Sequence, residues 1–372
     1  MNIKFWNKSE RKTNREDQKK SVAREWVDAI VFAVIAATII RWLFLEAFVI
    51  PTPSMERSLL VGDFLFVSKI HYGPRTPMTP LQVPLTHQKI WLTDIFVEGG
   101  VPSYLDWIKL PMYRLPGLTS IKRGDVVVFN FPPEMEYPVD LKTNYIKRCL
   151  GVPGDTFEIR DLGVFINGQP MEDPPQMQYK YYVRTNEAIN ERVFKRLKIS
   201  DYRAMGGGYL IYMTPEAAEE LGQMDMIREV RVGKMTDGEA NQGIFPSMSN
   251  SRWNEDFYGP LWIPKKDATI AINEETIDKY GGTIVDYEGL KNVTIEGQQL
   301  LIDGQAVSEY TFTQNYYFMI GDNRHNSLDS RFWGFVPENH VVGKAFFIWL
   351  SLDPAEPLLS KVRWSRLFNM IH

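Results

Sequence analysis

The longest uncharged apolar stretch of the chain lies near its N-terminus. Residues 29–40 carry no charge, and residues 1–25 before them include eight lysines and arginines. A basic flank followed by an apolar run is typical of a membrane anchor whose N-terminus stays in the cytoplasm. Because twelve residues are too few to cross about 30 Å of hydrocarbon, we expect the span to extend over residues 26–49. Arg41 and Glu46 would then reach towards the far interface.

A cleavable secretion signal has the same basic head and a core of similar length, and it is the alternative to a retained anchor. No A-x-A cleavage site follows the apolar core; the chain instead continues as Ile50-Pro51-Thr52-Pro53-Ser54. We therefore favour a retained anchor. The later apolar run at residues 345–350 is short enough for a buried strand and too short for a second span.

Beyond the anchor, short segments rich in β-branched and aromatic residues alternate with turn signals. They predict strands at residues 63–68, 125–130, 143–150, 156–166, 300–302, 316–320 and 344–352. Residues 156–169 and 294–305 echo each other, because each predicts strand, turn and strand followed by an Asn-Gly or Asp-Gly turn. The pattern therefore predicts a mainly β body with an antiparallel sheet.

Between these two related units the sequence pattern predicts both helices and strands. Helices are expected at residues 187–198, at 215–221 between a Thr214 cap and a Gly222 stop, and at 274–280 between an Asn273 cap and a Gly281 stop. Residues 71–120 hold many prolines with scattered aromatic residues, among them Trp91, Trp107 and Tyr113. We expect these aromatic side chains to pack against the β body, with a rim touching the membrane as the alternative.

The expected organisation has six parts. They are a cytoplasmic basic tail (1–25), a transmembrane anchor (26–49), the first part of a catalytic β domain (50–170) with an irregular Pro-rich insertion (71–120), an inserted second domain (171–292), the second part of the catalytic domain (293–352) and a C-terminal tail (353–372).

Composition narrows the choice of function. The 372 residues are 44% hydrophobic and 24% charged with a net charge of −4, so the chain as a whole has no electrostatic preference for nucleic acid. The single cysteine, Cys149, excludes an internal disulfide, and the five histidines form no HExxH motif. We expect no metal, no cofactor and no nucleic-acid partner.

Two residues far apart in the sequence could form a catalytic pair. Ser54 follows Pro51 and Pro53, which restrict the backbone and present the serine on a stiff segment. Alternation along the strand at 143–150 places Lys147 on one face with Tyr145 and Cys149. If that face is buried, desolvation lowers the pKa of the lysine and leaves an amine that can take a proton from a serine. A turn serine and a solvated strand lysine are the alternatives.

Four blocks that contain these residues resemble the bacterial type I signal peptidases. The blocks lie in the family's order at residues 41–69, 123–129, 145–155 and 321–334, the last containing Gly321-Asp322-Asn323-Arg324 and Ser327-x-Asp329-Ser330-Arg331. The resemblance implies a membrane-bound serine endopeptidase that removes leader peptides from exported preproteins through an acyl-enzyme. Its partners would be membrane-tethered preproteins and the lipid bilayer, with the catalytic domain on the extracytoplasmic side of the inner membrane.

The resemblance also implies roles for individual residues. Ser54 would be the nucleophile and Lys147 the general base, while the backbone N–H of Ser54 and the hydroxyl of Thr52 would form the oxyanion hole. The remaining residues either support the dyad (Ser327, Asp322, Asp329, Arg331, Arg148) or line shallow pockets for small leader residues at −1 and −3 (Ile50, Pro51, Met55, Leu59, Tyr145, Ile146).

Three positions depart from the family's pattern. Pro53 and Arg57 flank the serine where the family usually has a small residue and a proline, and His325 occupies a commonly acidic position. All groups with an implied chemical role are retained. Two other functions stay open: a silent membrane-held β platform that binds a partner, and a secreted Ser/His/Asp hydrolase, which would have to use His325.

Overall fold

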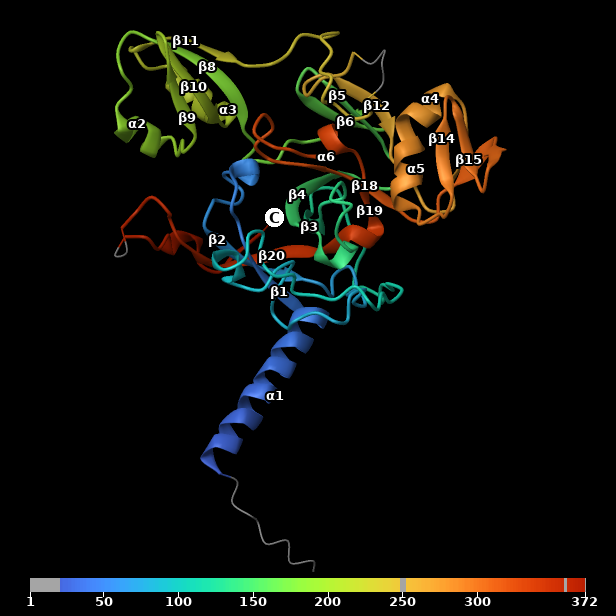
Figure 1. Ribbon diagram of the computed structural model, residues 1–372. Helices are drawn as coiled ribbons and strands as arrows, with labels where there is room; N and C mark the ends of the chain where they lie inside the picture. The colour runs from blue at the N-terminus through green and yellow to red at the C-terminus, as the bar shows by residue number, and fades with distance from the viewer. Residues whose placement is uncertain (1–20, 248–251, 358–359, 372) are drawn as a thin grey trace, which may run out of the picture.

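A single apolar helix precedes the β body. The computed structural model describes residues 21–247, 252–357 and 360–371; the expected cytoplasmic tail lies almost entirely outside them. Helix α1 (Val22–Leu43) begins after Ser21, whose side chain accepts a hydrogen bond from the Arg24 N–H. It buries no residue against the body and is long and apolar enough to cross a membrane. Figure 1 shows it extending away from the body.

The expected span 26–49 is wrong at its C-terminal end. Residues 45–49 form strand β1 (Leu45–Val49), which pairs antiparallel with β2 (Asp63–Ser68) from Leu45 opposite Ser68 to Val49 opposite Phe64. The ladder with β2 satisfies backbone groups that a longer helix would otherwise have used. Because the helix ends at Leu43, the polypeptide turns into the sheet immediately after the segment that could span a membrane.

The main sheet is antiparallel and joins the two ends of the chain. Its strands run in the order β1-β2-β20-β3-β4-β18-β19, and β21 also pairs with β20. The other strands of this sheet are β3 (Val126–Asn130), β4 (Asn144–Gly151), β18 (Tyr316–Ile320), β19 (Val336–Pro337), β20 (Val341–Ser351) and β21 (Asn369–Met370). Strands β3 and β18 are buried throughout. Strand β4 lies between them.

A second group of elements packs against the main sheet through the largest apolar core, which joins Phe157, Tyr258, Ile284 and Phe318. Its sheets are β12-β5-β6-β7, β13-β17 and β14-β15-β16. The bounds are β5 (Thr156–Arg160), β6 (Gly163–Ile166), β7 (Gln169–Pro170), β12 (Tyr258–Trp262), β13 (Thr269–Ala271), β14 (Val293–Glu296), β15 (Gln299–Ile302), β16 (Gln305–Val307) and β17 (Glu309–Thr311). The echo seen in the sequence is real, because β5-β6-β7 and β14-β15-β16 are both antiparallel three-stranded units.

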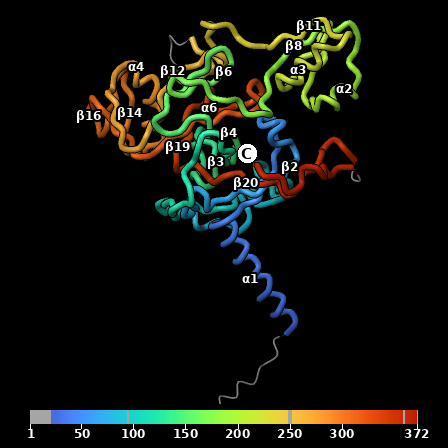
Figure 2. The backbone as a smooth tube through the Cα atoms, turned by 180° about the vertical axis from the view of Figure 1, so that it is seen from behind, coloured from blue at the N-terminus to red at the C-terminus, as the bar shows by residue number. Residues whose placement is uncertain are grey.

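A third group has an apolar core of its own. Its sheet runs β11-β8-β10-β9, and its core includes Val183, Phe194, Ile211 and Leu221. The elements are β8 (Tyr179–Thr185), α2 (Glu191–Arg196), β9 (Tyr202–Met205), β10 (Gly208–Met213), α3 (Pro215–Gly222) and β11 (Ile227–Val232). Figures 1 and 2 show this group beside the second one, on the side of the body away from α1. Strand pairing thus divides the segment 171–292, since β12 from the same segment joins β5.

Two short helices begin at their expected caps, whereas the helix expected at residues 187–198 is shorter: Asn190 caps α2, which ends at Arg196. Thr214 caps α3, and Asn273 begins α4 (Glu274–Thr276) with a reciprocal capping box. Gly281 does not end that helix: at φ −56° and ψ −49° it continues through the π-helical turn η4 (Ile277–Gly281) into α5 (Gly282–Tyr287). The remaining short elements are α6 (Ser330–Trp333) and the 3₁₀ turns η1 (Pro53–Met55), η2 (Thr93–Ile95), η3 (Val139–Leu141), η5 (Glu338–His340) and η6 (Trp364–Arg366).

The Pro-rich segment 71–120 is irregular, as expected, but its aromatic residues are not buried. Trp91, Trp107 and Tyr113 are 67%, 79% and 63% exposed, so the expectation that they pack against the body is wrong. The segment pairs with itself through isolated bridges such as Gln82–Tyr104 and Lys89–Pro102. These bridges satisfy backbone groups within the segment and leave apolar side chains facing outward. The loops lie around the C-terminal end of α1 (Figure 1).

Candidate active site

The serine predicted as nucleophile lies in a tight turn after an extended approach. Thr52 is extended at φ −130° and ψ 154°, and Pro53 opens the 3₁₀ turn η1 that contains Ser54. Before it, the Ile50 N–H donates to the Asp63 carbonyl, which ties the approach to the start of β2. Proline at the first position of a helical turn has its φ already set. Ser54 is therefore held on a constrained backbone, with its side chain 8% exposed.

The structure brings Lys147 of β4 directly to this serine. Its Nζ lies 2.8 Å from Ser54 Oγ and 3.0 Å from the carbonyl oxygen of Ile146. The lysine is 4% exposed, and Cys149, two residues further along the strand, is fully buried in a cluster with Tyr145 packed against it. The part of this face that carries Lys147 and Cys149 is thus buried, which excludes the alternative of a solvated strand lysine.

Burial changes the acid–base behaviour of this amine. Desolvation lowers the pKa of Lys147 to about 8, and the carboxylates of Asp329 and Asp322 oppose part of that shift. At pH 7 roughly one molecule in ten then carries an uncharged amine, and at pH 8 about half do. A neutral amine within hydrogen-bonding distance of a hydroxyl can act as a general base.

The segment after β18 holds the serine from the other side. The backbone N–H of Asn323 donates to the Ser54 carbonyl at 3.1 Å, and its side-chain amide donates to the Pro53 carbonyl at 3.1 Å. A Cβ atom at Gly321 would come within 2.5 Å of the Ser54 carbonyl oxygen and 2.2 Å of Ser327 Oγ. Only glycine fits at this close approach.

Two buried ion pairs stiffen the same segment. Arg148 donates to both carboxylate oxygens of Asp322 at 2.8 and 2.7 Å. Arg331 donates to both oxygens of Asp329 at 2.9 Å each, and Asp329 also accepts the Gly321 N–H. All four ion-paired residues are at most 6% exposed. Bidentate guanidinium–carboxylate pairs add geometric specificity as well as energy, so they fix the position of the Gly321–Asn323 backbone.

Ser327 lies near this centre but does not contact the amine. Its side chain is 9% exposed, and its hydroxyl has no hydrogen-bond partner among the described residues. The hydrogen bonds of Lys147 go to Ser54 and Ile146 instead. Thr52 is exposed, directly before η1. The orienting role of Ser327 and the oxyanion role of Thr52 stay predictions.

The residues expected to line substrate pockets differ in accessibility. Pro51 is exposed, and Tyr145 and Ile146 are half-buried on β4. In contrast, Ile50, Met55 and Leu59 are at most 3% exposed and belong to an apolar core cluster with Leu65, Val67 and Val128 of the sheet. The accessible members therefore border the surface near Ser54, while the buried members support it from beneath.

His325 occupies a different environment from the one a Ser/His/Asp triad needs. Its Nε2 lies 2.7 Å from Asp256 Oδ1, and its Nδ1 accepts the Lys180 N–H at 3.1 Å. Both ring nitrogens are thus engaged in joining the segment after β18 to β8 and to the chain before β12. Within the described residues no group of three or more His, Cys, Asp and Glu side chains has the arrangement of a metal site.

Some residues of the site were missed by the sequence analysis. Asn323 belongs to the fourth sequence block, but the sequence analysis predicted no role for it. Its position beside Asp322 in a run of polar residues could have indicated that it belongs to the site. Ser58, whose hydroxyl donates to Asp322 at 2.6 Å, has no such signal, because its partner lies 264 residues away.

A serine hydroxyl against a buried amine, in a β body that follows an apolar N-terminal helix, is an arrangement that fits a membrane-anchored serine peptidase. The family model for signal peptidase, peptidase S26, matches residues 23–210 and 263–350. The chain therefore belongs to this family of signal peptidases.

Curated relatives agree with the family model. Signal peptidase I of Buchnera aphidicola subsp. Acyrthosiphon pisum (strain APS) is 27% identical over 326 residues, which cover 87% of this chain and 73% of the relative. Signal peptidase I of Rickettsia bellii (strain OSU 85-389) is 27% identical over 377 residues, covering 97% and 90%. The protein is a membrane-anchored serine endopeptidase of the signal peptidase I type, which cleaves signal peptides from exported preproteins.

Proposed function

We propose that Ser54 and Lys147 are the nucleophile and general base of this peptidase. The observation that carries the proposal is the 2.8 Å distance between Lys147 Nζ and Ser54 Oγ in a buried environment. Lys147 has no ion pair among the described residues, and burial lowers its pKa to about 8. The constrained backbone around Pro53 and the hydrogen bonds from Asn323 support a fixed attack geometry.

The reaction proceeds in two halves. The uncharged amine of Lys147 takes the Ser54 hydroxyl proton as Oγ attacks the carbonyl carbon at the end of the signal peptide. The resulting ammonium gives that proton to the leaving amine, the C–N bond breaks, and the signal peptide stays on Ser54 as an ester. Lys147 then removes a proton from water, which attacks the ester carbonyl carbon. The bond between that carbon and Ser54 Oγ breaks, the Lys147 ammonium returns the proton to Oγ, and the signal peptide leaves with a free carboxyl group.

The charge that develops on the carbonyl oxygen needs hydrogen-bond donors. We assign this role to the backbone N–H of Ser54 and the hydroxyl of Thr52, and assign the orientation of the Lys147 amine to Ser327. Asp322, Asp329, Arg331 and Arg148 position the segment that holds Ser54. Preorganised donors of this kind are worth about 10²–10³-fold each in related acyl transfers.

The small-residue pockets follow from what is accessible near Ser54. Pro51, Tyr145 and Ile146 border the surface, backed by the buried Ile50, Met55 and Leu59. An apolar surface with a filled core behind it excludes bulky side chains by steric clash. We therefore propose that the enzyme accepts small residues at −1 and −3 of membrane-tethered preproteins.

The membrane arrangement follows from the charge asymmetry of the chain. The basic residues 1–25 favour a cytoplasmic N-terminus, with α1 crossing the inner membrane once and the catalytic body on the extracytoplasmic side. Ser54 lies 11 residues beyond Leu43, the last residue of α1. Holding enzyme and preprotein on one bilayer raises their effective concentration.

Cleavage of a preprotein with alanine at −1 and −3 tests the dyad. Ser54→Ala and Lys147→Met should each lower the rate by at least about 10³-fold, as expected when a catalytic group is removed. The exposed Ser365→Ala and the buried Lys142→Met are matched controls and should stay near the wild-type rate. Near-normal cleavage by either dyad variant rejects the assignment, and a wild-type protein inactive in both detergent and lipid vesicles would favour the silent binding platform.

A further inference from the structure

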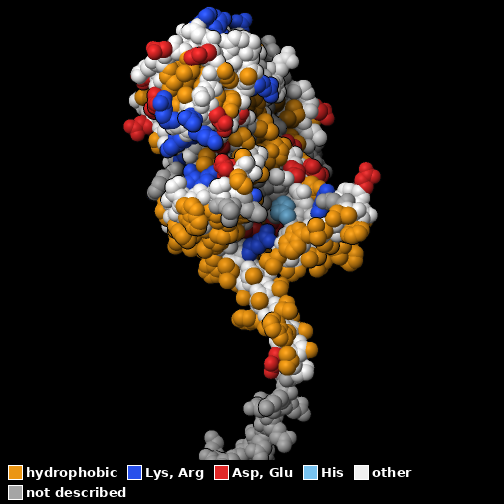
Figure 3. Space-filling view, turned by 90° about the vertical axis from the view of Figure 1, so that its left-hand side faces the viewer, with side chains coloured by type: hydrophobic (Ala, Val, Ile, Leu, Met, Phe, Trp, Pro, Cys, Tyr) orange, Lys and Arg blue, Asp and Glu red, His pale blue; other side chains and the backbone are white. Residues whose placement is uncertain are grey.

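A large pocket lies where the anchor helix meets the Pro-rich segment. It has a volume of about 440 Å³, and its lining includes Thr38, Ile39 and Trp42 from the last turns of α1, together with most of the residues between 75 and 87. The indole N–H of Trp42 donates to the carbonyl of Arg75 at 2.7 Å, which ties the helix to the loops. Figure 3 shows a hollow just above the helix, with basic and histidine side chains inside it and apolar side chains on both flanks.

The position of the pocket sets its surroundings. Its lining includes the C-terminal end of the one described helix that could span a membrane. The end of such a span lies at the depth of the lipid headgroups. The loops around the pocket expose apolar side chains, among them Val83 and Leu85, which are 44% and 36% exposed. A ligand with a polar head and apolar chains would match both parts of this site.

The charges that line the pocket do not balance. Three cationic residues, Arg41, Lys69 and Arg75, face two carboxylates. Glu46 already binds both Arg41 and Lys69, at 2.6 and 2.8 Å. The other carboxylate, Asp140, is held by the N–H groups of Met78 and Thr79 and by the Thr79 hydroxyl.

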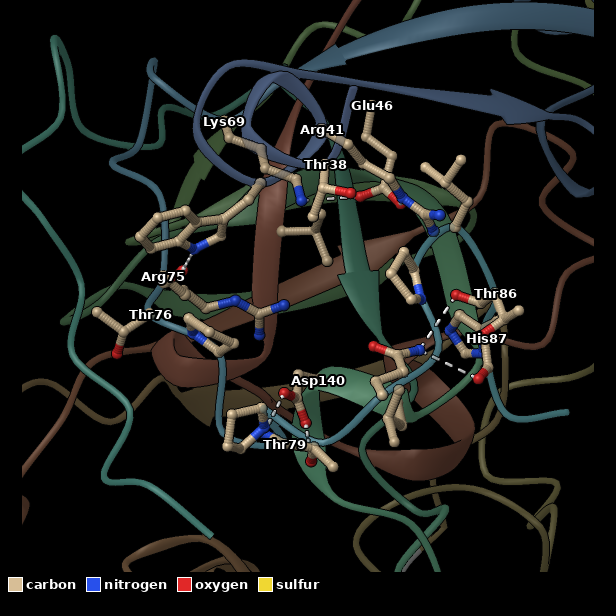
Figure 4. Close-up of a pocket in the computed structure, with 18 of the residues that line it drawn as sticks. Thr38, Arg41, Glu46, Lys69, Arg75, Thr76, Thr79, Thr86, His87 and Asp140 are labelled. Carbon is tan, nitrogen blue, oxygen red and sulfur yellow. Dashed lines mark hydrogen bonds and ion pairs between the residues drawn. The ribbon is translucent and has the colours of Figure 1, made fainter. Parts of the chain in front are cut away.

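Arg75 is the cation of the three that neither carboxylate binds directly. It donates to two neutral oxygens, the Asn339 carbonyl at 2.6 Å and the Asn130 side chain at 2.7 Å, and it has no ion pair among the described residues. Burial, with the nearby Arg114, lowers its pKa to about 9. Figure 4 shows the Arg75 side chain reaching towards the middle of the pocket, with Arg41, Glu46 and Lys69 on one side and Thr79 and Asp140 on the other.

We propose that this pocket binds the phosphate group of an anionic phospholipid, with Arg75 as its main donor, Arg41 beside it, and the acyl chains lying along the apolar surface of α1. Guanidinium groups are well suited to phosphate oxygens. A soluble phosphate ester shares the head chemistry but has nothing to occupy the apolar rim. The proposal relies on anchoring by α1 and is independent of the Ser54/Lys147 dyad.

Native mass spectrometry of the full-length chain in detergent tests this site, with dioleoylphosphatidylglycerol as the probe. Arg75→Gln should weaken retention of that lipid about tenfold or more, as expected for the loss of a charge-assisted hydrogen bond. Val83→Glu, which adds a carboxylate to the pocket from an exposed position, should weaken it similarly. Val101→Glu, which adds the same charge at a side chain 37% exposed in the same segment, should bind like the wild type.

Two further ligands separate the possible sources of binding. Dioleoylglycerol, which has the chains but no phosphate, should be retained about tenfold or more weakly than phosphatidylglycerol, and glycerol 3-phosphate should compete poorly. If all variants retain phosphatidylglycerol equally, or if the wild type retains both lipids equally, the pocket is not a phosphate site. If glycerol 3-phosphate binds as tightly as phosphatidylglycerol, the proposal that the ligand is a lipid is wrong. Preprotein cleavage by each variant reports folding, and Val83→Glu carries the test if Arg75→Gln is inactive.

Discussion

Two buried lysines in this protein make an instructive comparison. Lys147 and Lys142 are 4% and 3% exposed, and neither has an ion pair among the described residues. Burial lowers the pKa of both. Lys147 faces the hydroxyl of Ser54, whereas Lys142 donates to the Pro132 carbonyl and lies 3.3 Å from His340 Nε2.

The difference shows that burial alone does not make a base. Around Lys142 the neighbours are a carbonyl, a thioether and the His340 ring, whose own pKa is held well below its usual range by burial and by Lys142. None of these groups is a hydroxyl or thiol that an amine could deprotonate to give a nucleophile. Around Lys147 the neighbour is a hydroxyl on a constrained turn. Under the proposed mechanism, what separates a catalytic lysine from a structural one is therefore the group opposite its Nζ.

The largest expected effect comes from exchanging the two lysines for methionine. Lys147→Met should lower preprotein cleavage by at least about 10³-fold, because the base is lost. Lys142→Met should leave the rate within about threefold of wild type, since the contacts of Lys142 are structural. Rates measured at equal concentrations of folded enzyme check this. A comparable loss in both variants would show that the two lysines do not differ in role.

The next effect concerns the stability of the Lys147→Met variant, which should increase although its activity decreases. The pKa of Lys147 is about 8 in the folded protein against about 10.5 in the unfolded chain. Between these values the unfolded chain binds more protons, so stability rises with pH across that window. Below pH 8 the lysine is protonated in both the folded and the unfolded chain, so the folded protein bears the full free-energy cost of burying the charge, about 3 kcal/mol.

Lys147→Met should therefore raise the free energy of unfolding at pH 7 by about 1–3 kcal/mol, even though the same variant is expected to lose activity. The gain should shrink as the pH is raised from 8 to 10. Thermal unfolding of the full-length chain in detergent at several pH values measures both. A variant less stable than the wild type at pH 7 would contradict the prediction and show that the contact with Ser54 compensates the buried charge.

A smaller effect is expected in the pH dependence of cleavage. Because only the uncharged amine can take the serine proton, kcat/KM should rise with pH along a limb centred near the Lys147 pKa of about 8. The rate at pH 7 should be roughly a tenth of the plateau. Lys142→Met should keep the same limb. If kcat/KM does not change between pH 6 and 8, the group whose titration controls cleavage does not have the pKa of about 8 assigned to Lys147.

The same comparison separates what the sequence predicts from what it does not. Local signals found the strands at 63–68 and 316–320 and the caps Thr214 and Asn273, because alternation and capping act within a few residues. The end of α1 was predicted wrongly because it depends on the pairing of β1 with β2, and the exposure of Trp107 was predicted wrongly because it depends on how segment 71–120 pairs with itself.

The site divides in the same way. Ser54 and Lys147 could be named because they stand in recognisable motifs, and alternation placed Lys147 on one face with Tyr145 and Cys149 without saying whether that face is buried. Local sequence alone left a solvated lysine as the alternative. The Ser58–Asp322 hydrogen bond joins segments 264 residues apart and has no local signal. The contact of Lys142 with His340 likewise has no local signal, because His340 lies 198 residues further along the chain.

The smallest expected effect tests whether Ser327 acts together with Lys147 in the reaction or only packs near it. Its buried hydroxyl has no partner, whereas the nearby Ser330 hydroxyl accepts the Met319 N–H at 2.9 Å. Ser327→Ala should therefore leave the free energy of unfolding unchanged or raise it by less than about 1 kcal/mol, while Ser330→Ala should lower it by about 1–2 kcal/mol. If Ser327 orients the amine during the reaction, Ser327→Ala should also lower kcat about tenfold and displace the pH limb of cleavage, neither of which a packing role would do. Unchanged kcat and an unchanged limb would restrict Ser327 to packing against Gly321.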